Sequence, residues 1–186
     1  MMDKHTEKTG RYMMKDGSQY VIRPMRAGDG AGINELRRMP GVFENILGIP
    51  SESLARSEAF ASGSDPLTHA FVAEYCDSSG KSSIVGTAGL HLNGNPRMRH
   101  SGAIGIMIHR DFQGLGVGKQ LMGTLIDLGD NWLMLERIEL SVFVDNVRAI
   151  ALYEQLGFVK EGIKRKAAIR DGSYVDEFIM SRLKSE

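Results

Sequence analysis

The sequence contains one cysteine, Cys76, which therefore has no partner for an internal disulfide and favours a reducing compartment. Its 23 basic and 23 acidic residues cancel, so the overall charge gives no argument for nucleic acid or an anionic membrane as a partner. The N-terminal segment lacks an apolar stretch of signal-peptide length, and no segment approaches the roughly 18–20 apolar residues that span a bilayer. We therefore predict a cytoplasmic protein that binds neither nucleic acid nor membrane.

Length and composition are those of a single globular domain. The chain has 186 residues, of which 42% are hydrophobic and 25% are charged, close to the average of folded proteins. A chain of this length buries about 70% of its unfolded surface, so it can build a core without a metal or a disulfide. We predict a frayed N-terminal tail and a leading strand over residues 1–19, followed by one domain over residues 20–186.

Turn residues and hydrophobic periodicity predict strands and helices in the first half of the chain. The predicted elements are a hairpin over residues 11–14 and 19–25 that turns at Asp16-Gly17, a helix from residue 29 or 30 to Pro40, a second helix over residues 51–61 with Ser51 as its N-cap, and strands over residues 69–76, 82–92 and 99–109. The last of these strands is apolar enough for a central strand that is buried on both faces.

The second half continues as strand, helix, strand, helix and hairpin. The predicted elements are a helix with Leu121, Leu125, Leu128 and Trp132 on one face, a strand over residues 138–144, a helix over residues 147–156 that ends at Gly157, and a hairpin that turns at Asp171-Gly172. This order predicts an α/β fold with one mixed sheet and helices on both of its faces.

The segment from Gln113 to Lys119 (QGLGVGK) lies between the predicted central strand and the helix that follows. Its glycines would stand at a helix N-terminus, where unpaired backbone N–H groups and the helix dipole favour a phosphate group. The segment does not match a P-loop, because Gln120 follows Lys119, and it lacks the third glycine of the dinucleotide-binding fingerprint. The pattern Gln-x-x-Gly-x-Gly remains. Taken by itself, it could also be a flexible helix entry without a ligand.

A second motif runs from Asp145 to Phe158 (DNVRAIALYEQLGF), after the next predicted strand. Together the two segments resemble the Gcn5-related N-acetyltransferase (GNAT) family, in which the first binds the pyrophosphate of acetyl-CoA. The second is similar to the family's N-x-x-(A/S)-x-x-x-Y-x-x-x-G-F signature. The resemblance implies a GNAT fold that uses acetyl-CoA as the acetyl donor, with no metal and no covalent enzyme intermediate.

The resemblance also implies roles for individual residues. Asn146 would bond the pantetheine arm, and Tyr153 would protonate the thiolate that leaves. A thiol pKa of about 8.5 and a phenol pKa of about 10 are close enough for this transfer. Tyr153 could instead be a half-buried core residue, Asn146 only a helix N-cap, and Lys119 only a solvated side chain. The residues expected to bind the cofactor through their backbone are Ile106, Met107 and Ile108 along the pantetheine and Gln113, Gly114, Leu115, Gly116, Val117, Gly118 and Lys119 around the pyrophosphate.

The general base is less defined, because the reactive amine must lose a proton and many family members carry an acidic residue on the central strand. The corresponding stretch here, residues 102–105, has none. Glu139 on the next strand and His100 at the start of the central strand are the candidates, and a water relay is a third route.

The second half of the sequence looks especially similar to bacterial acetyltransferases of the α-amino group of free L-amino acids, and to phosphinothricin acetyltransferases. Arg97 or Arg99 could hold the carboxylate of such an acceptor, and Phe43 could contact an apolar side chain. A solvated basic loop and a core residue are the alternatives. We therefore predict acetyl transfer to a small-molecule amine, with a homodimer expected by resemblance. Acetylation of a protein N-terminus or lysine, or a non-catalytic acyl-CoA-binding module, remains open.

Overall fold

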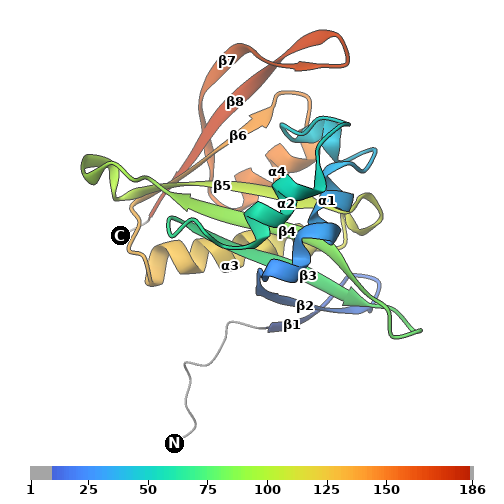
Figure 1. Ribbon diagram of the computed structural model, residues 1–186. Coiled ribbons are helices and arrows are strands. Elements are labelled where there is room, and N and C mark those ends of the chain that lie inside the picture. The colour runs from blue at the N-terminus through green and yellow to red at the C-terminus, as the bar shows by residue number, and fades with distance from the viewer. Residues whose placement is uncertain (1–9, 185–186) are drawn as a thin grey trace, which may run out of the picture.

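The computed structural model describes residues 10–184 and contains one eight-stranded sheet in the order β1-β2-β3-β4-β5-β6-β8-β7 (Figure 1). The strands are β1 Gly10–Met13, β2 Gln19–Pro24, β3 Thr68–Cys76, β4 Ser82–Leu92, β5 Ser101–Ile108, β6 Arg137–Phe143, β7 Val159–Arg170 and β8 Ser173–Leu183. The α-helices are α1 Gly30–Arg37, α2 Leu54–Ala61, α3 Val117–Asn131 and α4 Val147–Gln155. The predicted fraying of the first residues concerns a segment outside the described range, apart from Gly10.

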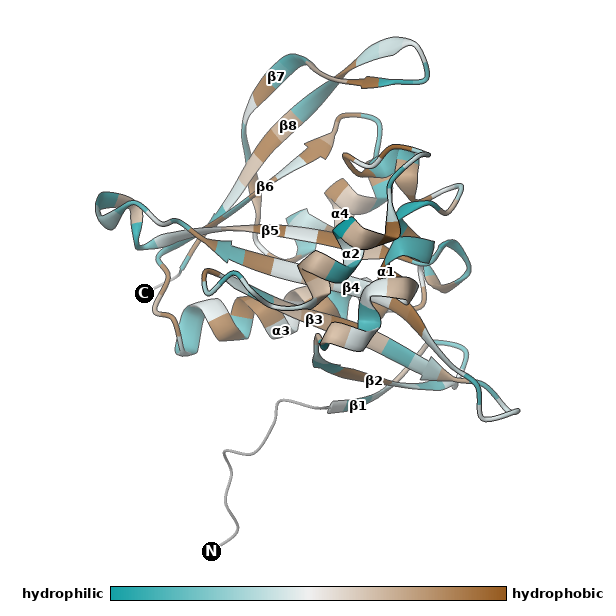
Figure 2. Cartoon of the chain, in the orientation of Figure 1, coloured by the Kyte–Doolittle hydropathy of each residue, from teal (hydrophilic) through white to brown (hydrophobic). Residues whose placement is uncertain are grey.

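Neighbouring strands are antiparallel except for β5 and β6, which are parallel and joined by α3. Helices cover both faces, as predicted. Buried residues of α3 and α4 pack on one face together with Ile104 of β5, whereas α1 and α2 pack on the other face together with Met107. Hydrophobic residues are concentrated along the central strands and hydrophilic residues in the connecting turns (Figure 2). The sheet is therefore the middle of three layers.

The prediction that the central strand is buried on both faces is wrong for part of β5. Ala103 and Gly105 are exposed, whereas Ile104 and Met107 are buried. Successive side chains of a strand point to opposite faces, so the open positions lie on the face that α1 and α2 share with Met107. These helices do not cover Ala103 and Gly105. A Cβ atom built on Gly105 would meet no described atom within 4 Å.

Two helix ends also differ from the prediction. The second helix begins at Leu54, with Ser53 rather than Ser51 before it. Glu52 explains the shift, because its buried carboxylate accepts hydrogen bonds of 2.7 and 2.9 Å from Arg37 of α1 and holds the chain outside the helix. Helix α3 ends at Asn131, and the side chain of Trp132 is 57% exposed instead of continuing the buried face.

The hairpin of β7 and β8 projects beyond the helices at the top of Figure 1. Its turn at Asp171-Gly172 is confirmed, since both residues have positive φ angles, of 48° and 73°, as a two-residue hairpin turn requires. At the base of the hairpin, Arg137 of β6 donates a hydrogen bond of 2.9 Å to Glu161 of β7, and Ser181 of β8 donates one of 2.6 Å to the same carboxylate.

This hydrogen-bond network leads to a prediction about how the stability of the fold depends on pH. The hydrogen bonds from Arg137 and Ser181 lower the pKa of Glu161 from 4.5 to about 2. Because the folded-state pKa is the lower one, the stabilisation is present above pH 4.5 and is lost as the pH falls towards about 2. We expect Glu161→Gln to lower the free energy of unfolding at neutral pH. The difference from the unmodified protein should shrink in acid, as followed by urea denaturation at a series of pH values. A pH-independent difference would contradict the network.

Candidate active site

A gap between two parallel strands lies at the centre of the sheet. The ladder between β5 and β6 covers only Ser101–Ala103 against Arg137–Glu139. Beyond Ala103, β5 continues as far as Ile108 beside β4, while β6 pairs with β8 and turns away from β5 (Figure 1). The two strands thus separate along most of their length and leave one edge of β5 without a neighbouring strand.

The register shows which backbone groups face this gap. The N–H of His109 donates to the carbonyl of Val85, which fixes the alternation of hydrogen-bonded pairs between β5 and β4. The backbone groups of Met107 therefore point towards β4, whereas those of Ile106 and Ile108 point into the gap. Of the three residues expected to pair with pantetheine, Met107 thus turns its backbone groups away. The carbonyl of Ile104, which the sequence analysis did not select, also points into the gap, while the pairing of Ala103 with Glu139 engages its N–H.

The glycine-rich segment opens α3 at the end of β5, which is the context that the sequence analysis required of a phosphate site. Gly114 and Gly116 have positive φ angles of 81° and 98°, and α3 begins at Val117. A Cβ atom at Gly118 would lie 3.4 Å from Leu152 of α4 and 3.6 Å from Ile108 of β5. The first turn of α3, with its unpaired N–H groups, therefore stands between β5 and α4. Lys119 is exposed beside it.

Gln113 connects the strand, the loop and the last helix. Its side-chain amide donates to the carbonyl of Ile108 at 3.1 Å, and its oxygen accepts a hydrogen bond of 2.6 Å from Arg148 of α4. In this structure Gln113 is therefore a link between segments. Arg148 is an exposed residue and forms part of that link.

Tyr153 of α4 is 7% exposed, and its ring centroid lies 6.0 Å from that of Phe158. Burial raises the pKa of its phenol to about 12, so the hydroxyl is protonated throughout the physiological range. Asn146 caps the same helix, because its side-chain oxygen accepts a hydrogen bond of 3.2 Å from the backbone N–H of Ala149. The N-cap alternative for Asn146 is thus confirmed as one of its roles, and its amide NH2 group is left to donate elsewhere.

The two candidate bases lie in different places. Glu139 is the last residue of β6 that pairs with β5, at the point where the gap begins, but its carboxylate accepts two hydrogen bonds from Arg137, each of 3.2 Å. His100 is exposed, and its backbone carbonyl accepts from Glu136 and Arg137 at the opposite end of β5 from the glycine loop. Their roles stay predictions.

The predicted acceptor contacts are also dispersed. Arg97 and Arg99 are exposed in the β4–β5 connection, next to His100 and at the far end of β5 from the glycine loop. Phe43 is half-buried in the segment between α1 and α2. Its neighbour Glu44 receives a hydrogen bond of 3.3 Å on its backbone carbonyl from Arg170 of the β7–β8 hairpin. The structure therefore brings Phe43, and not the two arginines, beside the hairpin.

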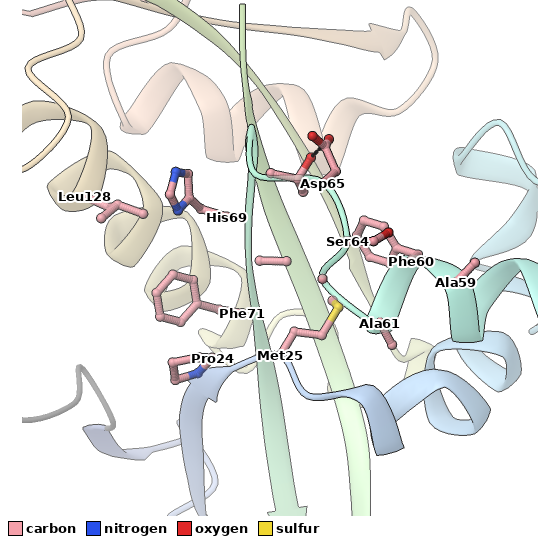
Figure 3. A pocket seen from close by; sticks show the side chains of 13 residues that line it. Pro24, Met25, Ala59, Phe60, Ala61, Ser64, Asp65, His69, Phe71 and Leu128 are labelled. Carbon is pink, nitrogen blue, oxygen red and sulfur yellow. Dashed lines mark hydrogen bonds between the residues drawn. The ribbon is translucent and has the colours of Figure 1, made fainter. Parts of the chain in front are cut away.

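A cavity of about 400 Å³ lies elsewhere, where α2 ends and β3 begins (Figure 3). His69 and Phe71 of β3 form one side of it with Leu128 of α3, and Asp65 bonds to Thr68 at its rim. None of its lining residues belongs to the glycine loop or α4. Among residues 10–184 no group of three or more His, Cys, Asp or Glu residues could hold a metal ion, and no helix is long and apolar enough to cross a membrane.

The sequence analysis missed the polar face that β6 and β8 present beside the gap. Glu139, Ser141 and Phe143 alternate with the core residues Ile138, Leu140 and Val142, and Phe143 pairs with Glu177 of β8. The alternation within IELSVF is visible in the sequence. That β8, and not β5, continues beside these residues depends on the pairing of distant segments.

Comparison with known proteins agrees with this geometry. Residues 41–158 match the Acetyltransferase (GNAT) family. The chain is 33% identical over 175 residues to the L-amino acid N-acetyltransferase AaaT of Escherichia coli K12, covering 90% of this chain and 99% of the relative. The crystal structure of spermidine N-acetyltransferase from Vibrio cholerae in complex with CoA and spermine superposes with a TM-score of 0.75 at 28% identity, covering 88% of this chain and 95% of that one. A putative phosphinothricin N-acetyltransferase shares the fold, with a TM-score of 0.75 at 21% identity over 90% and 99% of the two chains.

The fold and the site thus define an acyltransferase of the acetyl-CoA-dependent class. The chain belongs to the GNAT family of acetyltransferases, and it transfers an acetyl group from acetyl-CoA to the amine of a small molecule.

Proposed function

We propose that this enzyme acetylates the α-amino group of a free L-amino acid. The similarity to AaaT supports this acceptor because it extends over 99% of that protein. The observation that carries the chemistry is the gap between β5 and β6, which begins after Ala103 and ends at the N-terminus of α3. An extended thioester fits a strand edge that has no neighbour, and a pyrophosphate fits the helix terminus.

Acetyl-CoA would occupy the gap as an added strand. The carbonyl of Ile104 and the backbone groups of Ile106 and Ile108 would bond the pantetheine amides, and the N–H groups from Gly114 to Lys119 would hold the pyrophosphate. The amide NH2 of Asn146 would donate to the pantetheine arm. An N–H of the same strand edge would stabilise the oxyanion of the tetrahedral intermediate.

The reaction would proceed by direct attack. The acceptor first loses a proton to Glu139, His100 or a water relay and attacks as the neutral amine. A C–N bond forms to the thioester carbonyl, the nitrogen gives up a second proton by the same route, the C–S bond breaks, and CoA leaves as a thiolate. Burial raises the pKa of Tyr153 to about 12, which disfavours complete release of its proton. We therefore assign Tyr153 the role of a hydrogen-bond donor that stabilises the departing sulfur. This refines the proton donation expected from the sequence.

Thiol release from acetyl-CoA, followed over the twenty L-amino acids, spermidine and short peptides, tests the acceptor. We expect turnover with a subset of the free amino acids and none with the peptides. Turnover with spermidine alone would show that the acceptor is a polyamine and not an amino acid. Turnover with peptides alone would indicate a protein substrate. Tight acetyl-CoA binding without any turnover would indicate a binding module. The homodimer stays a prediction of the resemblance.

A further inference from the structure

Glu177 lies in the middle of β8, on a strand that neither sequence motif includes. Its backbone pairs with Phe143 of β6 on one side and with Lys164 of β7 on the other. Although its side chain is charged, the residue is only 9% exposed. The neighbouring strands cover most of the residue, while its carboxylate oxygens are not among the buried side-chain atoms that lack a hydrogen-bond partner and so remain in reach of solvent or a ligand.

The alternation of β8 places Glu177 on the acceptor side of the sheet. Phe178 and Met180 belong to the core beneath α3 and α4, so Glu177 points to the opposite face. On that face Glu177 stands beside Phe143 of β6, four residues beyond Glu139, on the side of the gap that β6 and β8 form. The carboxylate therefore lines the face from which an amine would reach a thioester held in the gap.

The cationic groups around Glu177 bind other partners. The ammonium group of Lys164, its neighbour on β7, donates a hydrogen bond of 3.2 Å to the hydroxyl of Ser141. Arg170, farther along the same strand, pairs with Asp145 and stands over the ring of Phe143. Within residues 10–184, no side chain or backbone group donates a hydrogen bond to the Glu177 carboxylate, and no cation lies within ion-pair distance of it.

Glu139 provides the contrast on the same face. It accepts hydrogen bonds from Arg137 and so has its counter-charge within the protein. Glu177 has no such counter-charge within residues 10–184, so its carboxylate is free to bind a ligand of the opposite charge.

We propose that Glu177 binds the ammonium group of the acceptor and thereby selects a primary amine for the reaction. This inference rests on the proposed function, since it assigns a contact to the amine substrate of that site. The ligand chemistry is that of an alkylammonium ion, whose three N–H donors match a carboxylate that has no other donor.

The test is Glu177→Gln, which keeps the shape of the side chain and removes its charge. We expect the KM for the amine acceptor to rise by about 10- to 100-fold, the range for losing a hydrogen bond to a charged group, with the KM for acetyl-CoA unchanged. The thermal stability of the free protein should stay the same, because the carboxylate makes no hydrogen bond or ion pair within residues 10–184 that the substitution would remove.

Glu161→Gln is the matched control, because it neutralises a carboxylate on the neighbouring strand that is fully paired. It should lower the stability and leave the acceptor KM unchanged, the reverse of the pattern for Glu177→Gln. An unchanged acceptor KM in Glu177→Gln, or a loss of stability like that of the control, would overturn the inference.

Calorimetric titration of L-methionine, L-phenylalanine and spermidine into the CoA-bound protein separates this inference from the proposed function. If the amines bind the unmodified protein, bind Glu177→Gln more weakly and are not turned over, the ammonium site is supported and the proposed function is rejected. Turnover with equal acceptor affinity in both proteins would leave the function standing and reject the site, and so would the absence of binding by all three amines.

Discussion

Tyr153→Phe is expected to lower kcat by about 10²- to 10³-fold and to leave acetyl-CoA affinity unchanged. The hydroxyl is the only group lost, and in the proposed mechanism it donates to a sulfur that bears negative charge in the transition state but not in the bound thioester. Removing a donor of this kind reduces the rate of the chemical step and not the strength of substrate binding. Steady-state thiol release, combined with calorimetric binding of CoA, measures both quantities.

Tyr20→Phe is the matched control for this variant. Tyr20 is 2% exposed, its hydroxyl has no hydrogen-bond partner among residues 10–184, and burial raises its pKa to about 12, as it does for Tyr153. It belongs to β2, away from the gap, so its variant should retain full activity. If Tyr153→Phe kept the activity of the unmodified protein, Tyr153 would be a core residue and the proposed chemistry would need another donor.

Gly116→Ala is expected to raise the Kd of acetyl-CoA by about tenfold or more. Gly116 precedes α3 with a φ angle of 98°, where a residue with a Cβ atom is strained by roughly 1–2 kcal/mol. Relief of that strain would turn the N–H groups of the loop away from the pyrophosphate. The Cβ atom itself would project into open space, so the effect should fall on the ligand and not on the packing.

Gly80→Ala provides the comparison for the glycine loop. Gly80 has a φ angle of 84° in the turn between β3 and β4 and also has open space around its Cβ position. Both variants should lose a similar amount of stability in chemical denaturation, because they carry similar strain. Only Gly116→Ala should lose acetyl-CoA affinity. Equal affinities in the two variants would show that the loop does not bind the cofactor.

Local signals in the sequence predicted most of the elements. The turn at Asp171-Gly172 and the helix that ends at Gly157 were recognisable because glycine takes positive φ angles at little cost. The start of α2 was not, because the ion pair between Glu52 and Arg37 joins residues from different helices and no local pattern encodes it.

The sequence by itself determined the order of strands and helices, the helix that opens at the glycine loop and the two motifs that mark the family. All of these depend on residues close together along the chain. Only the tertiary structure decided that β6 leaves β5 after Glu139, that Gln113 links β5 to Arg148, and that Glu177 stands beside Phe143 with no ion-pair partner among residues 10–184. These features arise from the pairing of distant segments, in which register and burial, not local propensity, set what each side chain meets.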